Sequence, residues 1–131
     1  MDKPFLNYES YTSLVEAIAS GKNPNAERHA QLITKAVAAF NGYVTEVCAS
    51  TNKIKFAYLY DEGEALREAV QNADAQRSSA HNSAIAMVTP LNRLAALYGL
   101  PDIFVGDVSD RIQVAGFCME MTGEIFRHRK L

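Results

Sequence analysis

Two long rows of side chains at helical spacing constrain the fold more than any other feature of the chain. In the stretch 25–60 the first row consists of Val37, Phe40, Val44, Val47, Thr51, Ile54 and Tyr58. In the stretch 64–98 the second row consists of Leu66, Val70, Ala73, Arg77, Ala80, Ala84, Met87, Leu91, Leu94 and Tyr98. Alternating steps of three and four place such residues on one face of an α-helix, in a heptad-type pattern. We therefore predict two helices, over about 25–60 and 64–98, each roughly 50 Å long.

The first of these helices has an alternative interpretation. Residues 41–42 and 50–52 are weak helix formers, but the row keeps its phase across both positions. Residues 54–60 also alternate between apolar and polar side chains, a pattern that a short β-strand would produce. We favour one continuous helix. In the second helix, Pro90 removes a backbone hydrogen bond and crowds a carbonyl group, so we predict a kink near Ala86.

Cap and turn signals divide the rest of the chain. Asn7 is a predicted N-cap for a helix over 8–20, which Gly21 ends. The Asn23-Pro24 pair predicts that the next helix begins there, with the proline at its first position. Asp61 and Glu64 have the spacing of a capping box at the start of the following helix, which the Gly99 region ends before Pro101.

The last predicted helix is capped by Asp107 or Ser109 and runs to about His128. Its predicted apolar face consists of Ile112, Ala115, Met119 and Phe126, together with Cys118 and Ile125. Gly116 and Gly123 fall on the same face, where glycine indicates that a neighbouring backbone or a large side chain comes close. The fold class is therefore all-α, a bundle of about four helices.

Composition excludes several classes of protein. The 131 residues are 48% apolar, and 13 basic and 15 acidic side chains give a formal net charge of −2. Ordinary apolar content and small net charge argue against disorder, and neither half has the basic excess of a nucleic-acid-binding surface. No apolar run approaches the roughly 20 residues of a membrane-spanning helix. Residues 1–4 lack the features of a signal peptide, so we expect a cytoplasmic protein without a membrane partner.

Length bears on domain organisation and on partners. We predict a single helical domain over 1–131, in which residues 1–24 form an N-terminal helical extension. Two helices of about 50 Å are too long for a chain of this size to cover by itself. The first long helix also carries apolar residues outside a single row. We therefore predict self-association, with a two-fold symmetric homodimer as the expected form.

One polar cluster is a candidate functional site. Its members lie on one stretch of the second long helix and at the start of the last helix: Asp74, Arg77, His81, Asn82, Asn92, Arg93, Asp107, Asp110 and Arg111. A functional interpretation is a pocket between helices, with His81 as acid or base and arginines that bind an anion. The structural interpretation, which we favour, is that paired charges hold the last helix against its neighbour. Because Arg77 lies on the apolar row, we expect it to pair with an acid, with Asp107 and Asp110 as candidates.

No motif in the chain indicates a particular chemistry. HExxH, GxxxxGK and GxSxG are absent, and no glutamate stands three residues before a histidine as di-iron bundles require. Arg77 and His81 are spaced too closely for helical ribonucleases with an Arg–His pair. A weak metal site from His81, Asp107 and Asp110 is a minor alternative. We predict no catalytic residue, resident metal or cofactor.

Three further side chains receive structural interpretations. Cys48 and Cys118 are isolated thiols in apolar surroundings, so both are expected to be small buried residues. His29 follows Arg28 near a predicted helix start and is expected to face solvent.

The stretch 74–111 carries a resemblance to a known family. The residues concerned are Arg77-Ser-Ser-Ala-His81-Asn82, Leu91-Asn92-Arg93, Tyr98-Gly99, Ile103-Phe104, Gly106-Asp107 and Asp110-Arg111. Over roughly 30–131 the chain resembles a family of small bacterial proteins that is known as a domain of unknown function and regarded as all-helical. Ala86 departs from the pattern, which has a polar residue there. The resemblance implies a helical fold and supplies no catalytic role.

The leading functional hypothesis is therefore a non-enzymatic, self-associating interaction module. The alternative is a small-molecule or nucleotide-processing protein with a site around His81, Arg77 and Arg93.

Overall fold

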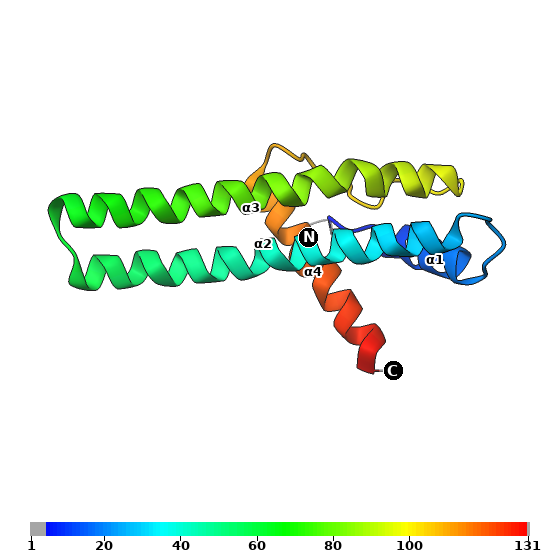
Figure 1. Cartoon of the computed structure of the whole chain (residues 1–131), viewed down its shortest axis with the longest axis horizontal. Coiled ribbons are helices and arrows are strands. Elements are labelled where there is room, and N and C mark those ends of the chain that lie inside the picture. Colours follow the sequence, from blue (N-terminus) through cyan, green and yellow to red (C-terminus); the bar gives the residue numbers. More distant parts are fainter. Residues whose placement is uncertain (1–4, 131) are drawn as a thin grey trace.

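The computed structural model describes residues 5–130, and the side chains of residues 5–123. It contains the helices α1 (Tyr8–Ala19), α2 (Ala26–Tyr60), α3 (Gly63–Leu97) and α4 (Arg111–Lys130). Helices α2 and α3 form a long antiparallel hairpin, α1 lies along one end of it, and α4 crosses its middle (Figure 1). The predicted all-α class with two long helices is confirmed. Residues 54–60 are helical, so the alternative strand is wrong.

The predicted face of α3 agrees with the structure. Ala73, Ala84, Leu91 and Leu94 are buried, and the other members of the predicted row, Arg77 included, are half-buried. Helix α3 continues through Pro90, and the kink near Ala86 stays a prediction.

The end of α3 also follows from the sequence. Gly99 has φ +73°, in the left-handed region that favours glycine. Its N–H donates to Ala96 O, and the N–H of Leu100 donates to Ala95 O. These two bonds form the helix ending that Gly99 predicts.

The buried face of α2 differs from the predicted one at every second position. Phe40 is buried as expected and Val47 and Ile54 are half-buried. The remaining inward positions are Ala36, Tyr43, Ser50 and Ala57, each one residue before the predicted Val37, Val44, Thr51 and Tyr58. Small side chains at three of these positions let α2 approach α3, where Ala73 and Ala84 are also buried. At those three positions the prediction placed the larger residue of each pair on the inward face. In the structure the smaller neighbour faces inward, because it allows the two helices to pack closely.

The first two helix starts agree in part with the prediction. Asn7 caps α1, because its Oδ1 accepts a hydrogen bond of 3.1 Å from Ser10 N. Gly21 ends the helix with φ +70°. Asn23 caps a turn by accepting from Asn25 N at 2.8 Å. Helix α2 then begins at Ala26, two residues after the predicted start.

The later two helix starts differ from the prediction. Helix α3 begins at Gly63, and no side chain caps it, so the capping box from Asp61 is wrong. At α4 the cap is Asp110, whose Oδ1 accepts from the backbone N–H groups of the first turn at 2.9 and 3.2 Å. Asp107 accepts instead from the N–H and hydroxyl of Ser109. The predicted caps were placed one to three residues too early.

Helix α4 starts later than predicted, and its inward-facing residues also differ from the predicted ones. The buried residues are Val114, Phe117, Cys118 and Met121. Of the predicted face, Cys118 is confirmed and Ala115 is half-buried, whereas Ile112 and Met119 are 81% and 47% exposed. Ile125 and Phe126 lie outside the described side chains. The Phe117 ring packs edge-on against Phe40 and Phe104, at 5.1 and 4.9 Å between ring centroids.

The predicted close approach is found at one of the two glycines of α4. A Cβ atom at Gly116 would lie 2.6 Å from the Phe5 ring, whereas at Gly123 it would meet nothing within 4 Å.

The segment before α1 closes the bundle. Leu6 forms an antiparallel bridge with Phe104. Val105 N donates to Phe5 O at 3.0 Å. The carboxylate of Glu120 on α4 accepts from the N–H groups of Phe5 and Leu6, at 3.2 and 2.6 Å. Leu14 and Ile18 of α1 are buried in the same core.

Much of the hairpin lies outside this core. The core cluster and the residues packed on it run from Phe5 to Val47 and from Ala80 to Met121. In Figure 1 the end of the hairpin that joins α2 to α3 extends well beyond α1 and α4. We call residues 52–64 the hairpin tip. Within the described part of the chain, no helix is long and apolar enough to cross a membrane.

Candidate functional site

Arg111, at the start of α4, contacts α3. Its Nη1 lies 3.2 Å from Asp74 Oδ1, and its Nη2 donates to Ser78 Oγ. The acid therefore lies on α3 and the base on α4, the reverse of the arrangement expected for Asp107 and Asp110. Both charged side chains are largely exposed, so the ion pair contributes roughly 0–1 kcal/mol. Its main consequence is to orient the first turn of α4 over α3.

Arg77 is half-buried between α2 and α3, and its partners differ from the predicted acid. Its Nε donates to Ser50 Oγ and its Nη2 to Thr51 Oγ1, both at 2.8 Å. Among the described side chains, none of the carboxylates lies within 4.0 Å of its guanidinium. The charge is therefore held by neutral hydroxyl groups.

His81 is buried, and one of its ring nitrogens has a hydrogen-bond partner. Its Nε2 lies 3.2 Å from the carbonyl oxygen of Val108. A carbonyl can only accept, so this geometry places a proton on Nε2. The ring also packs against Tyr43, at 5.6 Å between centroids. His81 thereby fastens the loop before α4 to the hairpin.

Asn92 has a structural role. Its Oδ1 accepts from the N–H groups of Ile103 and Phe104, at 2.8 and 3.0 Å, and its Nδ2 donates to Phe104 O at 3.4 Å. It therefore holds the connection between α3 and α4 in place. Asn82 and Arg93 are exposed on α3.

Asp107 and Asp110 are bound within their own turn. Hydrogen bonds from the backbone and side chain of Ser109 hold the pKa of Asp107 below its ordinary value. Hydrogen bonds from the side chain and backbone of Gln113 do the same for the pKa of Asp110. In the described part of the chain, no group of three His, Cys, Asp or Glu side chains is placed to hold a metal ion.

Two members of the predicted cluster, Arg77 and Arg111, border a cavity of about 430 Å³ beside α4. Arg77, Arg111 and Tyr43 supply its polar groups. Its other walls are Phe5, Val47, Ile112, Ala115, Gly116 and Met119. Burial raises the pKa of the Tyr43 hydroxyl, while the charges of Arg111 and Arg77 act in the opposite direction.

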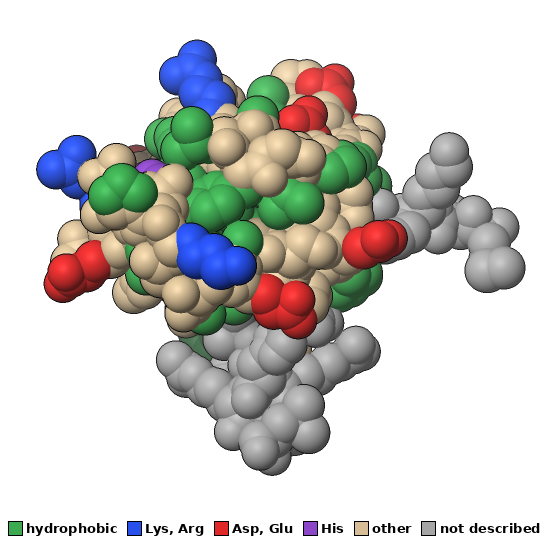
Figure 2. Space-filling view, turned by 90° about the vertical axis from the view of Figure 1, so that its right-hand side faces the viewer, with side chains coloured by type: hydrophobic (Ala, Val, Ile, Leu, Met, Phe, Trp, Pro, Cys, Tyr) green, Lys and Arg blue, Asp and Glu red, His purple; other side chains and the backbone are tan. Residues whose placement is uncertain are grey.

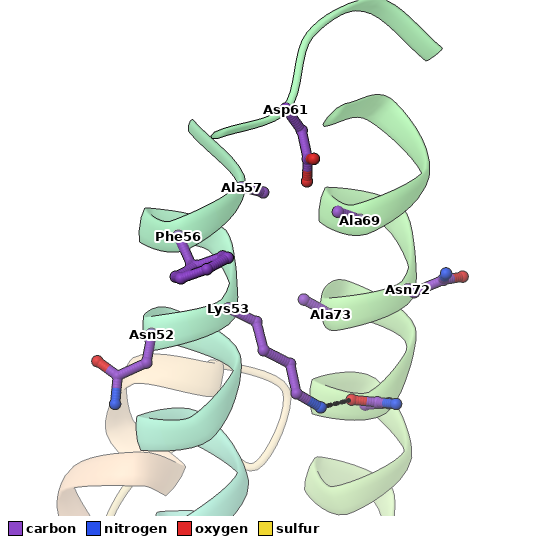
Figure 3. A pocket seen from close by; sticks show the side chains of 9 residues that line it. Asn52, Lys53, Phe56, Ala57, Asp61, Ala69, Asn72 and Ala73 are labelled. Atoms are coloured by element: carbon purple, nitrogen blue, oxygen red, sulfur yellow. Dashed lines mark hydrogen bonds between the residues drawn. The ribbon is translucent and has the colours of Figure 1, made fainter. Parts of the chain in front are cut away.

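A second cavity, of about 530 Å³, lies at the hairpin tip. In Figure 3 Asp61 points into the gap between the helices, and Lys53 extends across it to Gln76, with Nζ and Oε1 3.0 Å apart. Four large side chains at the tip are 63–75% exposed: Phe56, Tyr58, Leu59 and Tyr60. The rings of Phe56 and Tyr60 pack against each other, at 4.5 Å between centroids.

Two residues outside the predicted cluster also differ from expectation. His29 is buried, and its Nδ1 lies 2.8 Å from the hydroxyl of Tyr98, so the expected exposure to solvent is wrong. Cys118 is buried as expected, whereas Cys48 is exposed, so the expected burial of Cys48 is wrong.

Sequence reasoning missed the partners of Arg77 and the contribution of Tyr43. The available signal was the polar pair Ser50-Thr51 in the apolar pattern of α2. We interpreted that pair as a local weakness of the helix, although an arginine in the apolar row of the neighbouring helix needs such a partner.

Comparison with known proteins assigns the chain to a family. Residues 6–131 match the family described as protein of unknown function (DUF3232). The chain belongs to this family. The match begins well before residue 30, where the resemblance seen in the sequence begins, and it includes α1. No curated protein and no solved structure is significantly similar to the chain. The description of the family names no activity.

Proposed function

We propose that this family member is a cytoplasmic, non-enzymatic interaction module that self-associates through its hairpin tip. The observation that carries the proposal is the exposure of Phe56, Tyr58, Leu59 and Tyr60 where α1 and α4 do not cover the hairpin. Phe56, Leu59 and Tyr60 are spaced i, i+3 and i+4 and therefore share one face of α2. An exposed apolar patch of this kind marks an interaction site.

The charges at the tip favour a second copy as the partner. Lys53 and Lys55 are exposed on the α2 side of the tip, and Asp61, Glu62 and Glu64 lie at the turn and the start of α3. When two tips pair about a two-fold axis, the basic side of each copy can face the acidic side of the other. Such self-complementarity is what a two-fold interface requires.

The alternative, a processing site around His81, Arg77 and Arg93, has less support. Arg77 and Arg93 are separated by 16 positions on one helix, which corresponds to about 24 Å along its axis. His81 Nε2 is occupied by the Val108 carbonyl. A single small substrate would therefore not meet all three side chains.

Sedimentation velocity over a range of protein concentrations tests the proposal. Leu59→Glu places a charge on the apolar patch and is expected to weaken association by at least about tenfold, because a buried leucine contributes roughly 1.5–3 kcal/mol. The matched control is Leu97→Glu, at a position 65% exposed at the other end of α3. Figure 2 shows that end of the molecule, where apolar side chains lie among scattered charged ones.

Comparison of the two variants shows whether association depends on the hairpin tip or on exposed apolar residues in general. We expect the Leu97 variant to associate like the unmodified protein, and both variants to keep its helical circular dichroism spectrum. A chain that stays monomeric at every concentration would refute the proposal. So would a Leu59 variant that associates normally.

A further inference from the structure

The cavity beside α4 has the size and lining of a small-molecule site. Its volume of about 430 Å³ lies within the roughly 300–1,000 Å³ of ligand pockets. Such pockets are largely apolar, with a few polar groups that fix the orientation of the ligand. Here Val47, Ala115 and Met119 supply apolar wall, and Arg77 and Arg111 supply positive charge.

Arg77 provides the independent reason to expect an anion. A guanidinium has five N–H donors, and two of those of Arg77 donate to Ser50 and Thr51. Both acceptors are neutral, and the described side chains bring no carboxylate within 4.0 Å. Taking a charge partly out of water is unfavourable unless it is paired. An anion in the cavity would supply the missing counter-charge.

Arg111 and Tyr43 make the same wall more favourable for an anion. Arg111 also lines the cavity, and its guanidinium donates to Asp74 and Ser78, so that Asp74 offsets part of its charge. The hydroxyl of Tyr43 donates to the backbone oxygen of Arg111 across 3.5 Å, a long bond that a better acceptor can replace. An oxyanion could therefore meet two guanidinium groups and one hydroxyl.

We propose that this cavity binds a small amphiphile with a carboxylate head and a short hydrocarbon chain. The carboxylate accepts from the free N–H groups of Arg77, since a planar guanidinium matches a carboxylate geometrically. The hydrocarbon chain lies along Val47, Ala115 and Met119. This binding is independent of self-association, because no residue of the hairpin tip lines the cavity.

Isothermal titration calorimetry with octanoate tests the proposal. Octanol has the same chain without the charge, and acetate has the charge without the chain. We expect octanoate to bind at least tenfold more tightly than either. Equal binding of octanoate and octanol would overturn the carboxylate assignment, and the absence of any octanoate binding would overturn the site.

Two variants locate the binding. Arg77→Gln is expected to reduce octanoate affinity at least tenfold, whereas Arg93→Gln, an exposed arginine of the same helix, is expected to leave it unchanged. Because Arg77 also holds α2 and α3 together, Met119→Glu serves as the second variant. Met119 is half exposed, so a carboxylate there should repel octanoate while the melting temperature is kept.

Octanoate affinity that is unchanged in both cavity variants would overturn the location. The Leu59→Glu variant separates the two proposals, because it is expected to lose self-association and keep octanoate binding.

Discussion

Replacement of Asn92 by alanine tests the claim that this residue is structural. The side chain satisfies the backbone N–H groups of Ile103 and Phe104, two residues that are 0% and 3% exposed. In the Asn92→Ala protein both donors lose their acceptor inside the core. Asn92 itself is half-buried, so water can reach part of the space that its side chain leaves.

The expected loss follows from these two donors. Leaving a buried donor unsatisfied costs about 1–3 kcal/mol, so two donors would cost about 2–6 kcal/mol. Because water can reach part of this half-buried site, we expect Asn92→Ala to reduce the free energy of unfolding by about 2–4 kcal/mol. An unfolding entropy of about 2.1 cal/mol/K per residue gives about 0.28 kcal/mol/K for a chain of 131 residues. The melting temperature is therefore expected to fall by about 7–15 °C.

Thermal unfolding followed by circular dichroism is the assay. Asn82→Ala is the matched control, because Asn82 is exposed on the same helix. Asn92→Asp keeps the oxygen that accepts both bonds and replaces the Nδ2 donor by a second oxygen, so its melting temperature is expected to lie between those of Asn92→Ala and the unmodified protein. If Asn92→Ala melts within about 2 °C of the control, the assignment of a structural role is refuted.

Two further predictions concern titratable groups. Hydrogen bonds at the start of α4 hold the pKa of Asp110 below 3.8, so its ionised form stabilises the fold above pH 3.8, and this contribution is lost as the pH falls through the lower folded value. The melting temperature of Asp110→Asn should therefore decline less than that of the unmodified protein between about pH 5 and about pH 2, and parallel declines would contradict this. With a thiol reagent at pH 8, Cys48 should react in the folded protein. Cys118 should react only after unfolding, since burial raises its pKa to about 12, and equal rates for the two thiols would show that the core is open.

The helices themselves could be predicted because their signals are local. Periodicity in α3 gave the correct inner face, including the position of Arg77, since its inward residues are mostly apolar and its outward ones mostly polar. Helix α2 shows the limit of this reasoning. At Ala36, Ser50 and Ala57 the inward residue is small, and its larger neighbour faces outward or lies at the edge of the contact. Which of two adjacent residues faces inward depends on how closely α3 approaches, and that distance is a tertiary property.

The candidate site was less predictable for the same reason. The sequence placed Asp74, Arg77 and Arg111 in one cluster, but it could not show that Arg111 reaches Asp74 while Arg77 turns to hydroxyl groups of α2. Asn92 was placed in the cluster by its spacing. Its actual partners lie in the connection before α4, where no periodic pattern exists and backbone N–H groups carry no signal in the sequence. Polar residues can be located along a helix more readily than their partners can be identified.

The contacts of the first described residues affect the order in which the protein folds. Helices α2 and α3 are neighbours along the chain and can pair as soon as both exist, with little loop to close. Phe5 and Leu6 bind the carboxylate of Glu120, across 115 and 114 positions. During synthesis, which proceeds from the N-terminus, these residues emerge well before Glu120 and must wait for the intervening segment before their partner exists. The hairpin is therefore expected to assemble early, and the start of the chain to dock last.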